Sequence, residues 1–234
     1  MKYYYNRMPD GNEYRNNLIY TSLISEDQKT FVQWYHNDTE YHKGQNQVVD
    51  PELMNVKWDR EVKYLTLMYK NFPGLVPNIL DIDYLNKKIY LEIDGPDLWQ
   101  RTLDGNCSYS DIVPDWQEQM LLMFRAYRNL GIWKYSLHPS SYFIVDGRLK
   151  SINYFFTYQQ GEGTITVRDH LSHISEGRRE TMKPKTDALG IDWDEPQTLE
   201  KMQLLALESF SDMYPREFIE RAKHVFISTK MLDA

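Results

Sequence analysis

The chain has 234 residues, 41% of them hydrophobic and 26% charged, which is ordinary for a soluble globular protein that forms one large domain or one two-lobed unit. Its formal net charge of -7 disfavours a nucleic-acid binder that relies on attraction to phosphate, and the single cysteine, Cys107, excludes an internal disulfide. No apolar run approaches the roughly 20 residues of a membrane helix, and the polar N-terminus lacks the apolar core of a signal peptide. We therefore expect a cytoplasmic protein without a membrane partner.

The first third of the chain predicts β-strands. Two β-prone runs, Leu18–Ile24 and Thr30–Tyr35, are separated by a short polar stretch and predict an antiparallel pair. A second pair is expected at Ile79–Tyr84 and Ile89–Ile93. Asp94-Gly95-Pro96 then breaks the pattern and is expected to act as a connector.

One helix is predicted between these strand pairs. Pro51 is a favourable first residue, and apolar residues recur at helical spacing at Trp58, Val62, Leu65 and Tyr69. These positions step by four, three and four residues, which is typical of a helix.

The remainder of the chain is predicted to be mainly helical. A helix is expected from about Asp115 to Leu130, and two more near Gln197–Ser211 and Pro215–Ser228. Asp146-Gly147 between two alternating runs predicts a hairpin over 142–152. The polar stretch from Gln159 to Glu195 is expected to be irregular.

The segment from Gly131 to Tyr154 carries a family likeness. Gly131-Ile132 is followed by Lys134–Ser141, with the sequence KYSLHPSS, then by the predicted hairpin and Asn153. Protein kinases and the related small-molecule and lipopolysaccharide kinases place His-x-Asp-Leu-x-Pro-x-Asn between such elements. Leu137-His138-Pro139 matches the Leu-His-Pro of the small-molecule branch. Over roughly residues 18–158 the chain resembles the protein-kinase-like fold.

This resemblance implies an α+β fold with two lobes. A small antiparallel β lobe with one helix would span residues 1–93, and a mainly helical lobe would span 94–234, with the connector as hinge.

The chemical positions of the motif are replaced in this chain. By the resemblance, Ser136 stands where the family has its catalytic aspartate, which orients the attacking hydroxyl. Ser141 and Asn153 stand where an asparagine and an aspartate hold magnesium, an ion that prefers hard, usually charged oxygen ligands. Lys134 replaces the first histidine. We therefore expect no catalytic residue at these degenerate counterparts.

The small lobe indicates the same loss. Gly11 is the only glycine before Gly44, so no glycine-rich loop is available to approach phosphates. The phosphate-binding lysine falls on Gln33 or Trp34, depending on register, and its helix partner on Glu61. With Glu92 beside the connector, these residues are the candidates for lining a cleft.

A few residues outside the motif suggest other chemistry. His170 and His173, next to Asp169, have metal-ligand spacing but lack a third clearly spaced ligand, so no metal site is predicted. Asp81 and Asp83 alternate along a predicted strand and are expected to be edge charges. We expect Lys134 to be solvated and His138 to be structural.

These observations favour a catalytically inactive kinase-like protein, a pseudokinase, that binds another protein or regulates it, with no cofactor. One alternative is an atypical phosphotransferase or nucleotide-binding enzyme of the same fold that uses Asp146, Lys134 or Asp169. A third interpretation is an unrelated α+β structural or assembly protein. Small size, many Tyr and Asn residues and a divergent core also suit a viral or phage chain.

Overall fold

The computed structural model describes residues 2–5, 20–36, 51–162, 166–167 and 176–227. The chain folds into two compact units. The first unit is Met1–Gln119 with Pro139–Phe155, and the second is Met120–His138 with Phe156–Ala234. Helices and an antiparallel sheet occur together, so the predicted α+β class is confirmed. The predicted lobe boundary at residues 93 and 94 stays a prediction.

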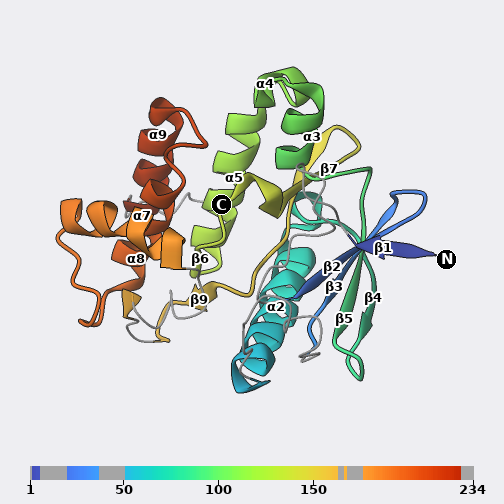
Figure 1. Cartoon of the computed structure of the whole chain (residues 1–234), viewed down its shortest axis with the longest axis horizontal. Helices are drawn as coiled ribbons and strands as arrows, with labels where there is room; N and C mark the ends of the chain where they lie inside the picture. Colours follow the sequence, from blue (N-terminus) through green and yellow to red (C-terminus); the bar gives the residue numbers. More distant parts are fainter. Residues whose placement is uncertain (1, 6–19, 37–50, 163–165, 168–175, 228–234) are drawn as a thin grey trace. The chain divides into compact units, whose positions relative to one another are not determined.

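A five-stranded antiparallel sheet forms the centre of the first unit (Figure 1). Its strands, in the order β1-β2-β3-β5-β4, are β1 (Tyr3–Tyr5), β2 (Thr21–Ser25), β3 (Thr30–Trp34), β5 (Lys88–Glu92) and β4 (Ile79–Asp83). Both predicted strand pairs are confirmed, and hydrogen bonds between β3 and β5 join them into one sheet.

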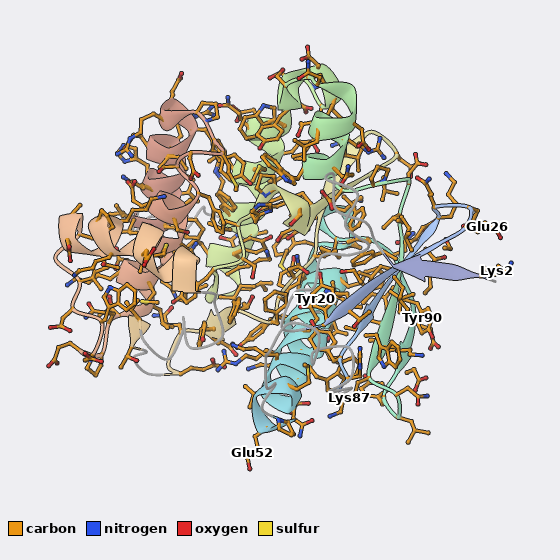
Figure 2. The ribbon with its side chains drawn as sticks, viewed as in Figure 1. Lys2, Tyr20, Glu26, Glu52, Lys87 and Tyr90 are labelled. Atoms are coloured by element: carbon orange, nitrogen blue, oxygen red, sulfur yellow. The ribbon has the colours of Figure 1, made fainter. Side chains whose placement is uncertain are left out.

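The two faces of this sheet differ because side chains alternate along each strand. On one face, Phe31 contacts the ring of Phe143 and Tyr35 contacts the ring of Trp58 in α2, with Gln33 between them along β3. The opposite face carries Trp34 and Tyr90. Figure 2 shows Tyr20 beside α2 and Tyr90 on the other side of the sheet. Helix α2 therefore packs on the face of the sheet that carries Gln33.

Helix α2 (Pro51–Asn71) begins at the predicted proline and packs on this face through residues spaced by three and four. Its buried row is Met54, Trp58, Glu61, Leu65 and Met68. Among the four apolar positions whose spacing predicted this helix, Tyr69 is 36% exposed. The buried row passes through Glu61 and Met68 instead, one position away from Val62 and Tyr69.

Short elements complete the first unit. After β5 come α3 (Leu98–Gly105), whose first turn is capped by the Asp97 side chain, and α4 (Tyr109–Ile112). The 3-10 turns η1 (Pro73–Leu75) and η2 (Pro139–Ser141) precede β4 and β7. Strands β7 (Tyr142–Val145) and β8 (Arg148–Ser151) form the predicted hairpin. Asp146 and Gly147 both have positive φ, which a type I′ turn requires.

The second unit is mainly helical. Helix α5 (Trp116–Asn129) starts in the first unit and continues into the second, where β6 (Ile132–Lys134) pairs with β9 (Thr157–Gln159). Helices α7 (Glu176–Ala188), α8 (Leu199–Ser209) and α9 (Arg216–Ile227) follow. The expected helices over 197–211 and 215–228 are confirmed as α8 and α9. The expectation of an irregular stretch up to Glu195 is wrong, because α7 lies within it.

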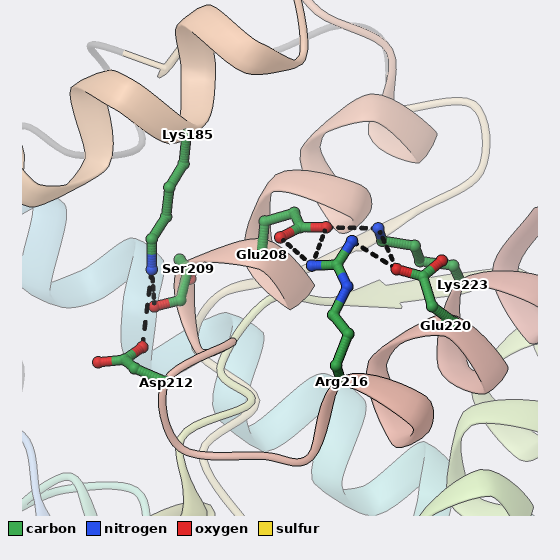
Figure 3. Close-up of polar contacts among 7 residues, drawn as sticks. All are labelled: Lys185, Glu208, Ser209, Asp212, Arg216, Glu220 and Lys223. Atoms are coloured by element: carbon green, nitrogen blue, oxygen red, sulfur yellow. Dashed lines mark hydrogen bonds and ion pairs between the residues drawn. The ribbon is translucent and has the colours of Figure 1, made fainter.

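Apolar packing and ion pairs hold this unit together. Phe124 of α5 contacts Phe218 and Phe226 of α9, and Trp133 of β6 stacks on Phe226. Near the chain reversal between α8 and α9, the Glu208 carboxylate accepts hydrogen bonds from Arg216 and forms an ion pair with Lys223 (Figure 3). Lys185 of α7 pairs with Asp212 at 3.6 Å. None of the described helices is both long and apolar enough to cross a membrane.

Candidate functional site

Gln33 is fully buried on the face of the sheet that packs against α2. Its amide Nε2 donates a 3.2 Å hydrogen bond to Oδ1 of Asn153, and the structure offers no partner for its Oε1 among the described residues. The sequence alone did not decide whether Gln33 or Trp34 stands at the position of the family's lysine, on the face toward α2. In the structure, Gln33 is the residue on that face. A neutral amide stands there.

Asn153 is the centre of a buried hydrogen-bonded cluster. Its Oδ1 accepts bonds from the Tyr20 hydroxyl at 2.6 Å and from Gln33, and its Nδ2 donates to Oγ of Ser141 at 3.0 Å. The backbone of Asn153 has φ of 66°, a left-handed conformation that asparagine tolerates better than most residues. We call Tyr20, Gln33, Ser141 and Asn153 the Asn153 cluster.

Glu61 places a buried carboxylate next to this cluster. Its Oε2 accepts a 2.8 Å hydrogen bond from the backbone N–H of Phe155 and a 3.2 Å bond from the Tyr35 hydroxyl. The carboxylate therefore connects α2 to the residue that follows β3 and to the chain that leaves β8. The sequence predicted Glu61 as the partner of a missing lysine, and in the structure it bonds a tyrosine and a backbone amide.

Two tyrosines link Glu61 to the Asn153 cluster. The rings of Tyr20 and Tyr35 lie 5.4 Å apart between centroids. Burial and the Glu61 charge raise the pKa of both phenols above the ordinary tyrosine value. Both hydroxyls therefore stay protonated at neutral pH and act as donors.

Two predicted cleft residues do not reach the cluster. Trp34 lies on the opposite face of the sheet, where its ring stacks near His36 and lies 4.4 Å from the Lys88 ammonium. Of the two residues that the sequence left open for the lysine position, Gln33 therefore faces α2 and Trp34 does not. Glu92 is on that same face, and its carboxylate accepts a 2.6 Å hydrogen bond from Asn78.

Lys134 and Ser136 belong to the second unit. The expectation of a solvated Lys134 is wrong, because the residue is fully buried in β6 and its ammonium donates to the backbone carbonyl of Ser136. His138 packs against the ring of Phe210 at 5.7 Å between centroids, which agrees with a structural role. The degenerate catalytic positions thus form two hydrogen-bonded pairs among the described residues: Lys134 with Ser136, and Asn153 with Ser141.

The other sequence candidates fall away from the cluster or outside the described residues. Asp81 and Asp83 lie on β4, which is an edge strand of the sheet, as expected. His170, His173 and Asp169 lie outside the described residues. Among the residues that the structure describes, no three histidine, cysteine or acidic side chains lie together in a way that could hold a metal ion.

The chemistry of the Asn153 cluster is neutral hydrogen bonding. The cluster contains the side-chain amides of Gln33 and Asn153 and the hydroxyls of Tyr20 and Ser141. The charged group beside it is the Glu61 carboxylate, which accepts a hydrogen bond from Tyr35. Sequence reasoning missed Tyr20 and Tyr35. A signal for Tyr35 was present, because it follows Phe31 and Gln33 at the strand period of two. Tyr20 gave no comparable signal.

Comparison of the chain with models of known protein families finds no match, and a search among curated proteins finds no relative.

Proposed function

We propose that this chain is a catalytically inactive kinase-like protein that acts as a protein-binding or regulatory module. One observation carries the proposal: Oδ1 of Asn153 accepts hydrogen bonds from both Tyr20 and Gln33. In the resemblance, Gln33 and Asn153 stand for the phosphate-binding lysine and the magnesium-binding aspartate. Here these two side chains are neutral, buried and bonded to each other.

Charge supports the loss of phosphate transfer. A metal–triphosphate needs cations against its phosphates and anionic oxygens against its metal. The Asn153 cluster supplies neither, and the nearby Glu61 carboxylate repels phosphate. Glu61 itself is occupied by Tyr35 and by the backbone of Phe155.

The order of elements also supports the proposal. A strand pair, a helix, a second strand pair, a connector, a helix and a hairpin follow one another as the resemblance implies. Asp94 in the connector is tied to Lys29 by a 2.5 Å ion pair, and Gly95 donates its N–H to the carbonyl of Gln28.

A protein partner would find apolar anchors on the turn between β4 and β5. Leu85 is 91% exposed there and Tyr84 is 65% exposed. Large exposed apolar side chains that lie together mark contact sites more often than single ones do. A pull-down with the Tyr84→Ser, Leu85→Ser double variant should lose partners that the wild type retains, whereas Leu122→Ser, at an exposed position on α5, should keep them.

Thermal unfolding with ATP and magnesium tests the inactive-site proposal directly. We expect no change in the midpoint, because ligands stabilise only the states that they bind. A rise of several degrees that a chelator abolishes, or transfer of radiolabelled phosphate to protein or small-molecule acceptors, would contradict it.

A further inference from the structure

Tyr20 fills the interior of the Asn153 cluster with its own ring. The residue is only 4% exposed, and its ring lies within 5.4 to 6.5 Å, between centroids, of the rings of Tyr35, Phe155 and Phe31. Three aromatic walls thus fix one phenol at the start of β2.

The hydroxyl of this phenol takes a position that a ligand would need. Oδ1 of Asn153 has two lone pairs, and Tyr20 and Gln33 use both. A ligand that reaches Asn153 from this side must therefore displace the phenol. The Oε1 atom of Gln33 remains as a buried acceptor for which the described residues provide no donor.

Electrostatics decide which ligand chemistry the site would accept. None of the side chains of the Asn153 cluster is basic, and the Glu61 carboxylate acts on Tyr20 strongly enough to contribute to its raised pKa. An anion would meet this negative charge without a compensating cation in the cluster. A neutral aromatic molecule with one hydroxyl donor matches both the ring walls and the Asn153 acceptor.

From this arrangement we propose that Tyr20 is the ligand-excluding residue of the site, and that its removal opens a pocket for a small neutral phenol. The inference rests on the proposed function, an inactive kinase-like protein, because the Tyr20 ring would be one structural reason why the cluster excludes phosphate ligands. Buried apolar cavities left by truncated side chains bind small aromatic molecules of matching size.

The experiment uses the whole chain with Tyr20→Ala, probed by p-cresol, which is the side chain that the substitution removes. We expect p-cresol to raise the thermal midpoint of Tyr20→Ala by several degrees in a concentration-dependent way. Toluene, which lacks the hydroxyl, should raise it less. Wild type and Tyr20→Phe, in which the ring still fills the space, should not respond to either compound.

Two outcomes would overturn the inference: an equal response of wild type and Tyr20→Ala to p-cresol, or no response of a folded Tyr20→Ala. Should Tyr20→Ala be unfolded alone, p-cresol must restore its folded circular dichroism, and absence of rescue there counts against the inference. Magnesium-ATP added to wild type gives a separate readout. Stabilisation by magnesium-ATP would contradict the proposed inactive site while leaving the p-cresol result for Tyr20 unaffected.

Discussion

The hydroxyl of Tyr20 and the amide of Asn153 meet at 2.6 Å across 133 residues of sequence. Both side chains are almost completely buried, at 4% and 6% exposure. A buried hydrogen bond contributes modestly when it is made, but its loss leaves an unsatisfied polar group in a place that water does not reach. This bond therefore ties the start of β2 to the end of the β7–β8 hairpin.

Energetic coupling between Tyr20 and Asn153 can be measured by a double-mutant cycle. Tyr20→Phe removes only the hydroxyl, and Asn153→Gly removes the amide while keeping a residue that readily adopts positive φ. We expect the two changes in unfolding free energy, measured in urea, to be non-additive by about 1 kcal/mol. Tyr20→Phe combined with Asp59→Ala, at an exposed position of α2, should be additive. Additivity in both pairs would contradict the hydrogen bond.

Glu61→Ala is expected to destabilise the protein by at least about 2 kcal/mol, because it leaves the Tyr35 hydroxyl and the Phe155 N–H without their buried acceptor. Asp59→Ala, on the solvent side of the same helix, should stay within about 0.5 kcal/mol of wild type. Chemical denaturation of both variants gives the comparison. Equal effects would mean that the buried carboxylate contributes nothing specific.

Lys57 predicts a pH dependence on the alkaline side of neutrality. Burial, and then the charge of Arg60, lowers the pKa of Lys57 from 10.5 to about 7. Between these values the unfolded chain binds more protons than the folded chain, so the contribution of this residue to stability increases with rising pH. Lys57→Met should be more stable than wild type at pH 7, and its advantage should shrink toward pH 9. The exposed Lys63→Met is the control, and a pH-independent difference for Lys57→Met would contradict the shift.

Glu208 predicts a pH dependence on the acid side. Partial burial alone would raise the pKa of this carboxyl, but Lys223 and Arg216 outweigh it and hold the pKa below its usual range (Figure 3). A carboxyl with a depressed folded pKa stabilises the protein above its unfolded pKa, and that contribution is lost as pH falls through the folded value. Glu208→Gln should therefore lose less stability than wild type from about pH 5 downward. Glu195→Gln, at an exposed position, should follow the wild-type curve.

Restoring three family residues should not restore catalysis. The variant Ser136→Asp, Ser141→Asn, Asn153→Asp keeps Gln33 in place of the lysine and keeps the Tyr20 ring inside the cluster. The new carboxylate at 153 would also lie near the Glu61 charge. We expect a folded variant by circular dichroism and no transfer of radiolabelled phosphate from ATP. Magnesium-dependent turnover from these three changes alone would argue against the proposed inactive site.

Much of the local structure could be predicted because it follows from periodicity and turn chemistry. The alternation of β3, the Pro51 start of α2 and the Asp146-Gly147 turn each depend on neighbours in sequence. The same periodicity does not predict the exposure of Tyr69. The buried row of α2 shares Trp58 and Leu65 with the apolar pattern, but it also includes the charged Glu61, which an apolar pattern cannot indicate.

The candidate site was less predictable because its partners are distant. Gln33 and Asn153 are 120 residues apart, and Glu61 and Phe155 are 94 apart, so no local pattern connects them. By the resemblance, Ser141 and Asn153 both stand at magnesium-binding positions of the motif, and in the structure they are hydrogen-bonded to each other. Lys134 could not be predicted as buried, because a lone lysine in sequence favours a solvated position.

The chain passes between the two units three times, after Gln119, after His138 and after Phe155. This has a consequence in time during biosynthesis. The Glu61 carboxylate accepts a hydrogen bond from the backbone N–H of Phe155, which is synthesised 94 residues later. At a synthesis rate of about 5–20 residues per second, the Glu61 carboxylate lacks this hydrogen-bond donor for about 5–20 seconds. Until then, docking of α2 would bury an incompletely bonded charge, so we expect the first unit to complete its fold only after Phe155 has left the ribosome.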